Sequence, residues 1–162
     1  MEGKMGAVVI YYSLEGNTEF IAKLLSLNLE ADIIKLEPRK EIPKKGLLKY
    51  IIGGLSAILH HKPELSNERI PLDKYDTVIL GTPIWAGTYS TPINTFLSEY
   101  KMSGKNIILF ACHSGSGANK AFNQISKELE GNKILHAIDF VDPVRQNLEQ
   151  LENRVVALCN TI

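Results

Sequence analysis

Residues 13–18 combine side chains and backbone groups that can hold an anion. They are Ser13, Leu14, Glu15, Gly16, Asn17 and Thr18. The two hydroxyls can donate hydrogen bonds, Gly16 lets the backbone approach a phosphate closely, and a helix start would add unpaired N–H groups. The segment holds no Lys or Arg, so it is not a Gly-Lys-[Ser/Thr] nucleotide-binding loop. Ordinary helix capping, with Asn17 or Thr18 as the N-cap, is the alternative interpretation, because Ser, Thr and Asn are common at helix starts.

A second segment carries the only tryptophan of the chain. It comprises Thr82, Pro83, Ile84, Trp85, Ala86 and Gly87. An aromatic ring beside exposed backbone amides suits a flat heteroaromatic ligand, because the ring stacks on its face and the amides bond its edge. The alternative is that Trp85 packs this loop onto the next helix.

A third segment is rich in glycine and serine. It comprises Cys112, His113, Ser114, Gly115, Ser116 and Gly117. Such a loop allows close approach of the backbone to a ligand edge. We interpret His113 as a polar loop residue near the ligand rather than a general acid or base. Its neighbour Cys112 is poorly placed for a thiolate–imidazole pair, so the sequence predicts no catalytic residue, and it predicts no metal site.

Strands and helices alternate along the whole chain. Apolar runs predict strands at 5–11, 31–36, 77–81, 106–111 and 133–141. Helical spacing of apolar residues predicts helices at 20–25, 47–59, 93–100, 118–129 and 144–158, the last capped by Asp142-Pro143. This alternation predicts an α/β fold with three layers, in which a five-stranded, doubly wound parallel sheet has the order 2-1-3-4-5.

The three segments follow the first, third and fourth predicted strands. In a doubly wound sheet, ligands bind at the carboxyl ends of the strands, where the strand order reverses. The fold therefore brings the segments to one edge of the sheet, and together they predict one ligand site.

Composition narrows the class of protein. A chain of 162 residues suits a single domain, 1–162, which would bury roughly 70% of its unfolded surface. Lys+Arg and Asp+Glu are both 18, so no basic field indicates nucleic acid. Two cysteines without a CxxC pattern are typical of reduced cytoplasmic thiols. We expect a cytoplasmic protein without a signal peptide or an integral membrane segment.

Several motifs resemble the flavodoxin family over essentially the whole chain. Residues 12–19 resemble its phosphate loop, Ser/Thr-x-Thr/Ser-Gly-Asn-Thr, and residues 73–85 resemble its third strand and first flavin loop. Residues 114–117 fall where its second flavin loop belongs. The resemblance implies bound FMN, with Ser13 and 15–18 around the phosphate. It also implies 82–87 along one side of the isoalloxazine and 114–117 at its pyrimidine edge.

The chain departs from the family pattern in its charges. Glu15 stands where the family often has Thr or Ser, so we expect its carboxylate to point away from a phosphate. The net charge is zero, whereas electron-carrier flavodoxins are usually acidic. Basic residues are concentrated before and within the second helix: Lys35, Arg39, Lys40, Lys44, Lys45 and Lys49. They form either a solvated face or a docking surface for an acidic partner or an anionic membrane.

The resemblance implies electron transfer between redox partner proteins or to a small-molecule acceptor. The alternative is an FMN-dependent NAD(P)H:quinone-type oxidoreductase. A receiver domain shares the strand order but needs a phosphorylatable Asp after the third strand, where Thr82-Pro83 stands. The oligomeric state is left open between monomer and homodimer.

Overall fold

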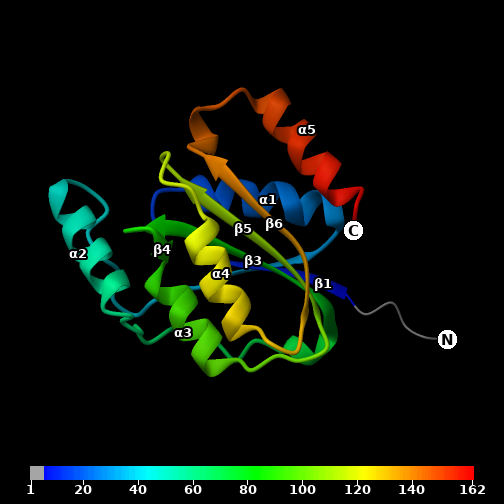
Figure 1. The fold of residues 1–162 in the computed structure, drawn as a ribbon, viewed down its shortest axis with the longest axis horizontal. Helices are drawn as coiled ribbons and strands as arrows, with labels where there is room; N and C mark the ends of the chain where they lie inside the picture. Colours follow the sequence, from blue (N-terminus) through cyan, green and yellow to red (C-terminus); the bar gives the residue numbers. More distant parts are fainter. Residues whose placement is uncertain (1–5) are drawn as a thin grey trace.

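The computed structural model describes residues 6–162 as a sheet between two helical layers (Figure 1). The strands are β1 (Gly6–Tyr11), β2 (Asp32–Lys35), β3 (Tyr75–Trp85), β4 (Thr88–Tyr89), β5 (Asn106–His113) and β6 (Lys133–Val141). The helices are α1 (Asn17–Leu29), α2 (Leu47–Ile58), α3 (Thr91–Glu99), α4 (Asn119–Glu128) and α5 (Leu148–Cys159). Met5, the predicted start of the first strand, lies outside the described residues.

The sheet confirms the predicted strand order. Its path is β2-β1-β3-β5-β6 with every neighbouring pair parallel. This is the order 2-1-3-4-5 once the short β4, which pairs antiparallel with the end of β3, is set aside. The additional strand was not predicted, because a two-residue strand carries no periodicity.

Two apolar cores lie on opposite faces of the sheet. Successive strand residues point to opposite faces, so Val8 and Ile10 join one core and Val9 joins the other. The first core includes Phe96 of α3 and residues of α4, and the second includes residues of α1 and α5. Strands buried on both faces explain why the central strands read as continuous apolar runs.

Helix α2 belongs to neither layer and stands at the side of the molecule (Figure 1). It buries only Gly53 and Ala57. A Cβ added at Gly53 would lie 3.1 Å from the Ile42 side chain and 3.7 Å from the Trp85 ring. The glycines in this helix therefore serve close packing against the end of β3.

Two predicted boundaries were wrong at the edge of the site, and β5 also runs two residues past its predicted end, to His113. Asp142-Pro143 does not start the last helix: Asp142 has φ of 38°, Pro143–Arg145 form a single 3-10 turn, and α5 begins only at Leu148. The Asp142 carboxylate accepts a hydrogen bond from Ser114 Oγ at 2.7 Å and is not used as a cap. The cap of α5 is Asn147, whose side chain accepts from the Gln150 N–H.

The second boundary concerns the end of the third strand. Residues 82–85, predicted as loop, continue β3, because the strand keeps pairing with β5 as far as Pro83 and Cys112. Beyond that point the strand pairs with β4, as Ile84 and Trp85 face Tyr89 and Thr88. Only Ala86 and Gly87 remain as a turn.

A close contact between β3 and β5 yields a test of this register. Gly81 lies opposite Phe110, and a Cβ at Gly81 would overlap the Phe110 ring, which is fully buried. We expect Gly81→Ala to lower the free energy of unfolding by about 2–3 kcal/mol in urea denaturation, because the ring has no space to move. Gly6→Ala is the control, since its Cβ would meet Tyr75 at an ordinary 3.5 Å. Equal stability of the two variants would contradict the register.

Candidate functional site

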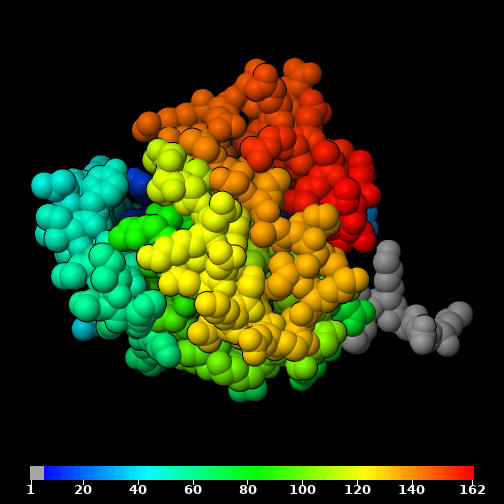
Figure 2. Space-filling model, viewed as in Figure 1, coloured from blue at the N-terminus to red at the C-terminus, as the bar shows by residue number. Residues whose placement is uncertain are grey.

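A cavity of about 430 Å³ opens at the carboxyl ends of β1, β3 and β5. In Figure 2 it lies where α2 stands apart from the yellow-green segment before α4. All predicted site residues line it except Gly16, Thr82, Gly115 and Gly117. The sequence analysis missed five further lining residues: Lys49, Tyr50, Gly53, Gly54 and Asp142.

The first loop leaves the N-terminus of α1 open to the cavity. Gly16 occupies the N-cap position with φ of 99°, and no side chain caps the helix. The ordinary capping interpretation, with Asn17 or Thr18 as the cap, is therefore wrong. Thr18 is 1% exposed, and its buried hydroxyl has no hydrogen-bond partner within residues 6–162. Unpaired N–H groups and the helix dipole favour an anion at this position.

The cation that the first loop lacks comes from α2. The Lys49 ammonium donates a hydrogen bond to the Glu15 carboxylate, and this bond raises the pKa of the Lys49 amine. The Lys49 side chain is only 14% exposed, whereas that of Glu15 is 49% exposed. The pair fastens α2 to the anion-binding loop and directs the Glu15 carboxylate toward α2. Lys49 belongs to the group of basic residues noted in the sequence, but the sequence does not place it beside the first loop.

Trp85 is held from two sides. Its ring meets Tyr12 edge to face, with centroids 5.6 Å apart and an interplanar angle of 90°. The Tyr12 hydroxyl donates to Glu41 at 2.9 Å, and burial raises the pKa of this phenol. Gly53 of α2 approaches the same Trp85 ring. Trp85 thus packs against Tyr12, the residue after β1, and against α2, and it borders the cavity.

The Ala86-Gly87 turn has an unusual backbone. Both residues have positive φ, 49° and 78°, and they connect the paired Trp85 and Thr88. Two-residue hairpin loops favour this conformation because it matches the strand twist. Glycine accepts it readily, but alanine is strained there. The strain lies at the edge of the cavity.

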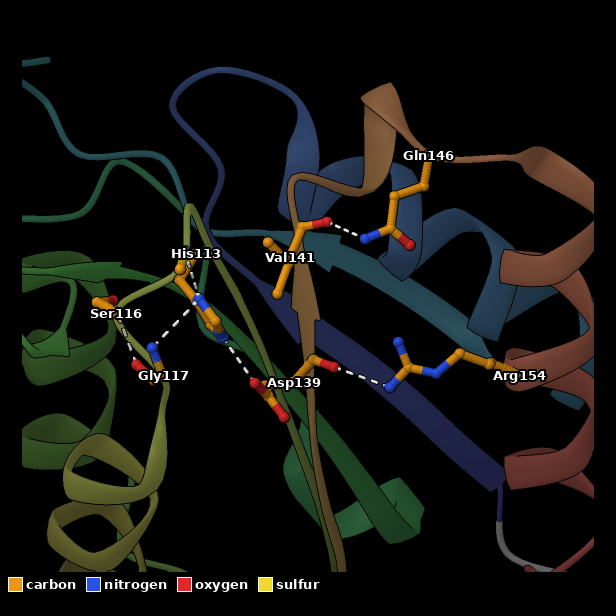
Figure 3. A network of polar contacts seen from close by, with 8 residues as sticks. His113, Ser116, Gly117, Asp139, Val141, Gln146 and Arg154 are labelled. Atoms are coloured by element: carbon orange, nitrogen blue, oxygen red, sulfur yellow. Dashed lines mark hydrogen bonds and ion pairs between the residues drawn. The ribbon is translucent and has the colours of Figure 1, made fainter.

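His113 holds the third loop in place (Figure 3). Its Nδ1 accepts the backbone N–H groups of Gly115 and Gly117 at 2.9 and 3.3 Å. The proton of the neutral ring therefore lies on Nε2, which is 2.6 Å from Asp139 Oδ2. Both ring nitrogens are engaged and the side chain is only 4% exposed. His113 is a positioning residue for the loop.

Four predicted residues do not face the cavity, and three of them shape the loops. Gly16, Gly115 and Gly117 all have positive φ, which glycine adopts at little cost. The hydroxyl of Thr82 accepts the Ser90 N–H at 3.0 Å and lies 3.2 Å from Ser90 Oγ. Thr82 therefore joins β3 to the start of α3 beneath the cavity.

Cys112 is not poised as a nucleophile. Burial raises the pKa of its thiol to about 12, so the thiolate is scarce at neutral pH. Within residues 6–162, no group of three or more His, Cys, Asp and Glu side chains is arranged to hold a metal ion. Nor does any helix in that range have the length and apolar character to cross a membrane.

The sequence profile named Flavodoxin matches residues 6–138. The chain therefore belongs to the flavodoxin family. No curated protein matches the sequence significantly.

Solved structures share the fold at low identity. A protein assigned as a flavoprotein in Bacteroides eggerthii superposes with a TM-score of 0.77 at 20% identity, over 97% of each chain. A Lactobacillus acidophilus flavoprotein in complex with FMN gives 0.71 at 20% identity, over 83% of this chain and 93% of the other. Oxidised flavodoxin 2 from Bacillus cereus gives 0.61 at 16%, over 96% of each chain.

The role of His113 is testable by amide hydrogen exchange. In His113→Phe the Gly115 and Gly117 N–H groups lose their acceptor, so we expect their exchange to accelerate about tenfold or more. His136→Phe is the control, because His136 contacts Thr161 far from this loop. Unchanged exchange at both glycines would show that the loop holds its shape without His113.

Proposed function

We propose that this chain binds FMN in the cavity and carries electrons with it. One observation carries the proposal: a buried, unpaired Thr18 hydroxyl stands at the uncapped N-terminus of α1, inside a cavity lined by the three segments. Membership of the flavodoxin family and the fold shared with an FMN complex from Lactobacillus acidophilus support it. Bound FMN supplies the capacity to accept and release electrons.

The residues present fit the chemistry of FMN. Thr18 and Ser13 offer hydroxyls to the phosphate, and the first N–H groups of α1 offer further donors. Lys49 adds a positive charge that Glu15 partly neutralises. In this proposal Trp85 and the 113–117 loop flank the flat ring system of the flavin. The other lining residues can make apolar and backbone contacts with the flavin.

Electron transfer is favoured because the side chains at the cavity are occupied with holding its shape. Both nitrogens of His113 are engaged, and the Cys112 thiol is buried. In this proposal these groups shape the site of a cofactor and exchange no protons with a substrate. The cytoplasmic location stays a prediction, as does electron exchange with redox partner proteins or a small-molecule acceptor.

An NAD(P)H:quinone-type oxidoreductase is the second candidate function. The observation in its favour is the net charge of zero, whereas electron-carrier flavodoxins are usually acidic. The two functions differ in whether a nicotinamide reduces the flavin directly.

The phosphate site can be tested by comparing FMN with riboflavin, which lacks the phosphate. We expect Thr18→Val to weaken FMN binding by about 10- to 100-fold, as a hydrogen bond to a charged group is lost. Riboflavin affinity should change little. Because the Thr18 hydroxyl has no partner in the described chain, the stability of the protein without FMN should not fall. Flavin fluorescence titration measures both affinities.

Lys49→Met should also weaken FMN more than riboflavin, with Lys120→Met on the exposed side of α4 as the control. Equal losses for the two flavins would place the phosphate elsewhere. If purified protein neither carries nor binds FMN, the proposed function is wrong.

The electron-transfer role predicts a slow reaction with nicotinamides. We expect NADH or NADPH to leave the yellow absorbance of the FMN-loaded protein unchanged over minutes, whereas dithionite bleaches it. Stopped-flow absorbance makes the measurement. Bleaching within seconds by NAD(P)H would favour the oxidoreductase.

A further inference from the structure

Helix α2 turns its large apolar side chains to solvent. We name this surface the α2 apolar face: Leu47, Leu48, Ile51, Leu55 and Ile58 of the helix, and Leu59, which follows it. Each of these side chains is at least 54% exposed. At about 100° per residue they fall within a single stripe of about 120°. The buried Gly53 and Ala57 lie on the opposite side of the helix.

This arrangement reverses the usual pattern of a surface helix. Such helices bury large apolar residues and expose polar ones. Here the small residues face the body of the protein, while the one lysine of the helix, Lys49, turns away from the stripe to reach Glu15. A stripe of six exposed aliphatic side chains is an apolar patch of the kind that marks an interaction surface.

Positive charge borders the α2 apolar face at both ends. Lys44 and Lys45 precede the helix, and Lys62 follows it after His60 and His61. The three lysines are exposed, and none forms an ion pair within the described part of the chain. The only acidic residue between 40 and 62 is Glu41, whose carboxylate accepts the Tyr12 hydroxyl.

We propose that the α2 apolar face docks on an anionic lipid surface. The aliphatic side chains would enter the interface, and the flanking lysines would lie at the level of the lipid phosphates. Helix α2 stands out at the side of the molecule (Figure 1). A deformable lipid surface accepts such a ridge, whereas a protein would need a matching groove.

Charge also argues against a second copy of the chain as the occupant. A two-fold interface sets the same patch of both subunits against itself. The lysines at the borders of one α2 apolar face would then approach those of the other, and like charges repel. An anionic lipid surface can bury the apolar stripe in its interface and pair its phosphates with the flanking lysines.

The test is flotation of the 162-residue protein with phosphatidylcholine vesicles, with and without phosphatidylglycerol. We expect it to float only with the anionic vesicles at low salt and to be released as salt rises. The double substitution Lys44→Gln, Lys45→Gln removes two positive charges and should lower the partition coefficient roughly 30-fold. Ile51→Gln with Leu55→Gln should abolish flotation. None of these four residues lines the cavity.

Matched controls separate the patch from general surface effects. Lys120→Gln with Lys133→Gln removes two exposed charges elsewhere, and Leu27→Gln removes an aliphatic side chain that is 78% exposed on α1. These variants should float like the original protein, and circular dichroism should show that all variants fold. Because none of the measurements uses FMN, failure here leaves the proposed function untouched.

Three results would overturn the inference. The first is no flotation with anionic vesicles at low salt. The second is unchanged flotation of the Ile51→Gln, Leu55→Gln protein, which would show a purely electrostatic contact such as an acidic protein could make. The third is a dimer in sedimentation velocity that this double variant dissociates, which would make a second copy the occupant.

Discussion

The site depends on one constraint of the fold, the divergence of the chain after two neighbouring strands. β1 leads into α1, which packs on one face of the sheet, and β3 leads into α3, which packs on the other. The loops that follow these strands separate and cannot fill the space between them. Because every strand of a parallel sheet ends at the same edge, the loop after β5 borders that space too. The cavity is thus a consequence of topology, and side chains determine only what it can hold.

Buried polar contacts connect this edge to the two cores. The Thr82 hydroxyl joins β3 to Ser90, and the Tyr12 hydroxyl reaches Glu41 before α2. His113 joins its own loop to Asp139 on β6. Each contact satisfies polar groups that would be costly to bury alone, and each fixes a loop relative to a strand. The loops are therefore shaped before any ligand arrives, which reduces the entropy that a ligand must overcome.

The sequence predicts the fold and most of the cavity because the signals involved are local. β6 begins and ends as predicted from its apolar run, and the three loops follow from glycines and hydroxyls beside strand ends. Contacts between distant segments carry no such signal, so Lys49 and Gly53 were missed. Asp142 shows how a local rule fails: its side chain is taken by Ser114, and the helix starts later. Tertiary partners override capping preferences wherever they satisfy the same oxygen.

Helix α2 is attached to the body through small residues and one ion pair, whereas the other helices contribute large side chains to the cores. The free energy needed to detach it is therefore a small part of that needed to unfold the protein. Its release would open the wall of the cavity that contains Gly53 and Gly54 and would leave both cores intact. We therefore expect this helix to offer a route of entry and exit, with the rate of ligand exchange set by a local opening and not by global denaturation.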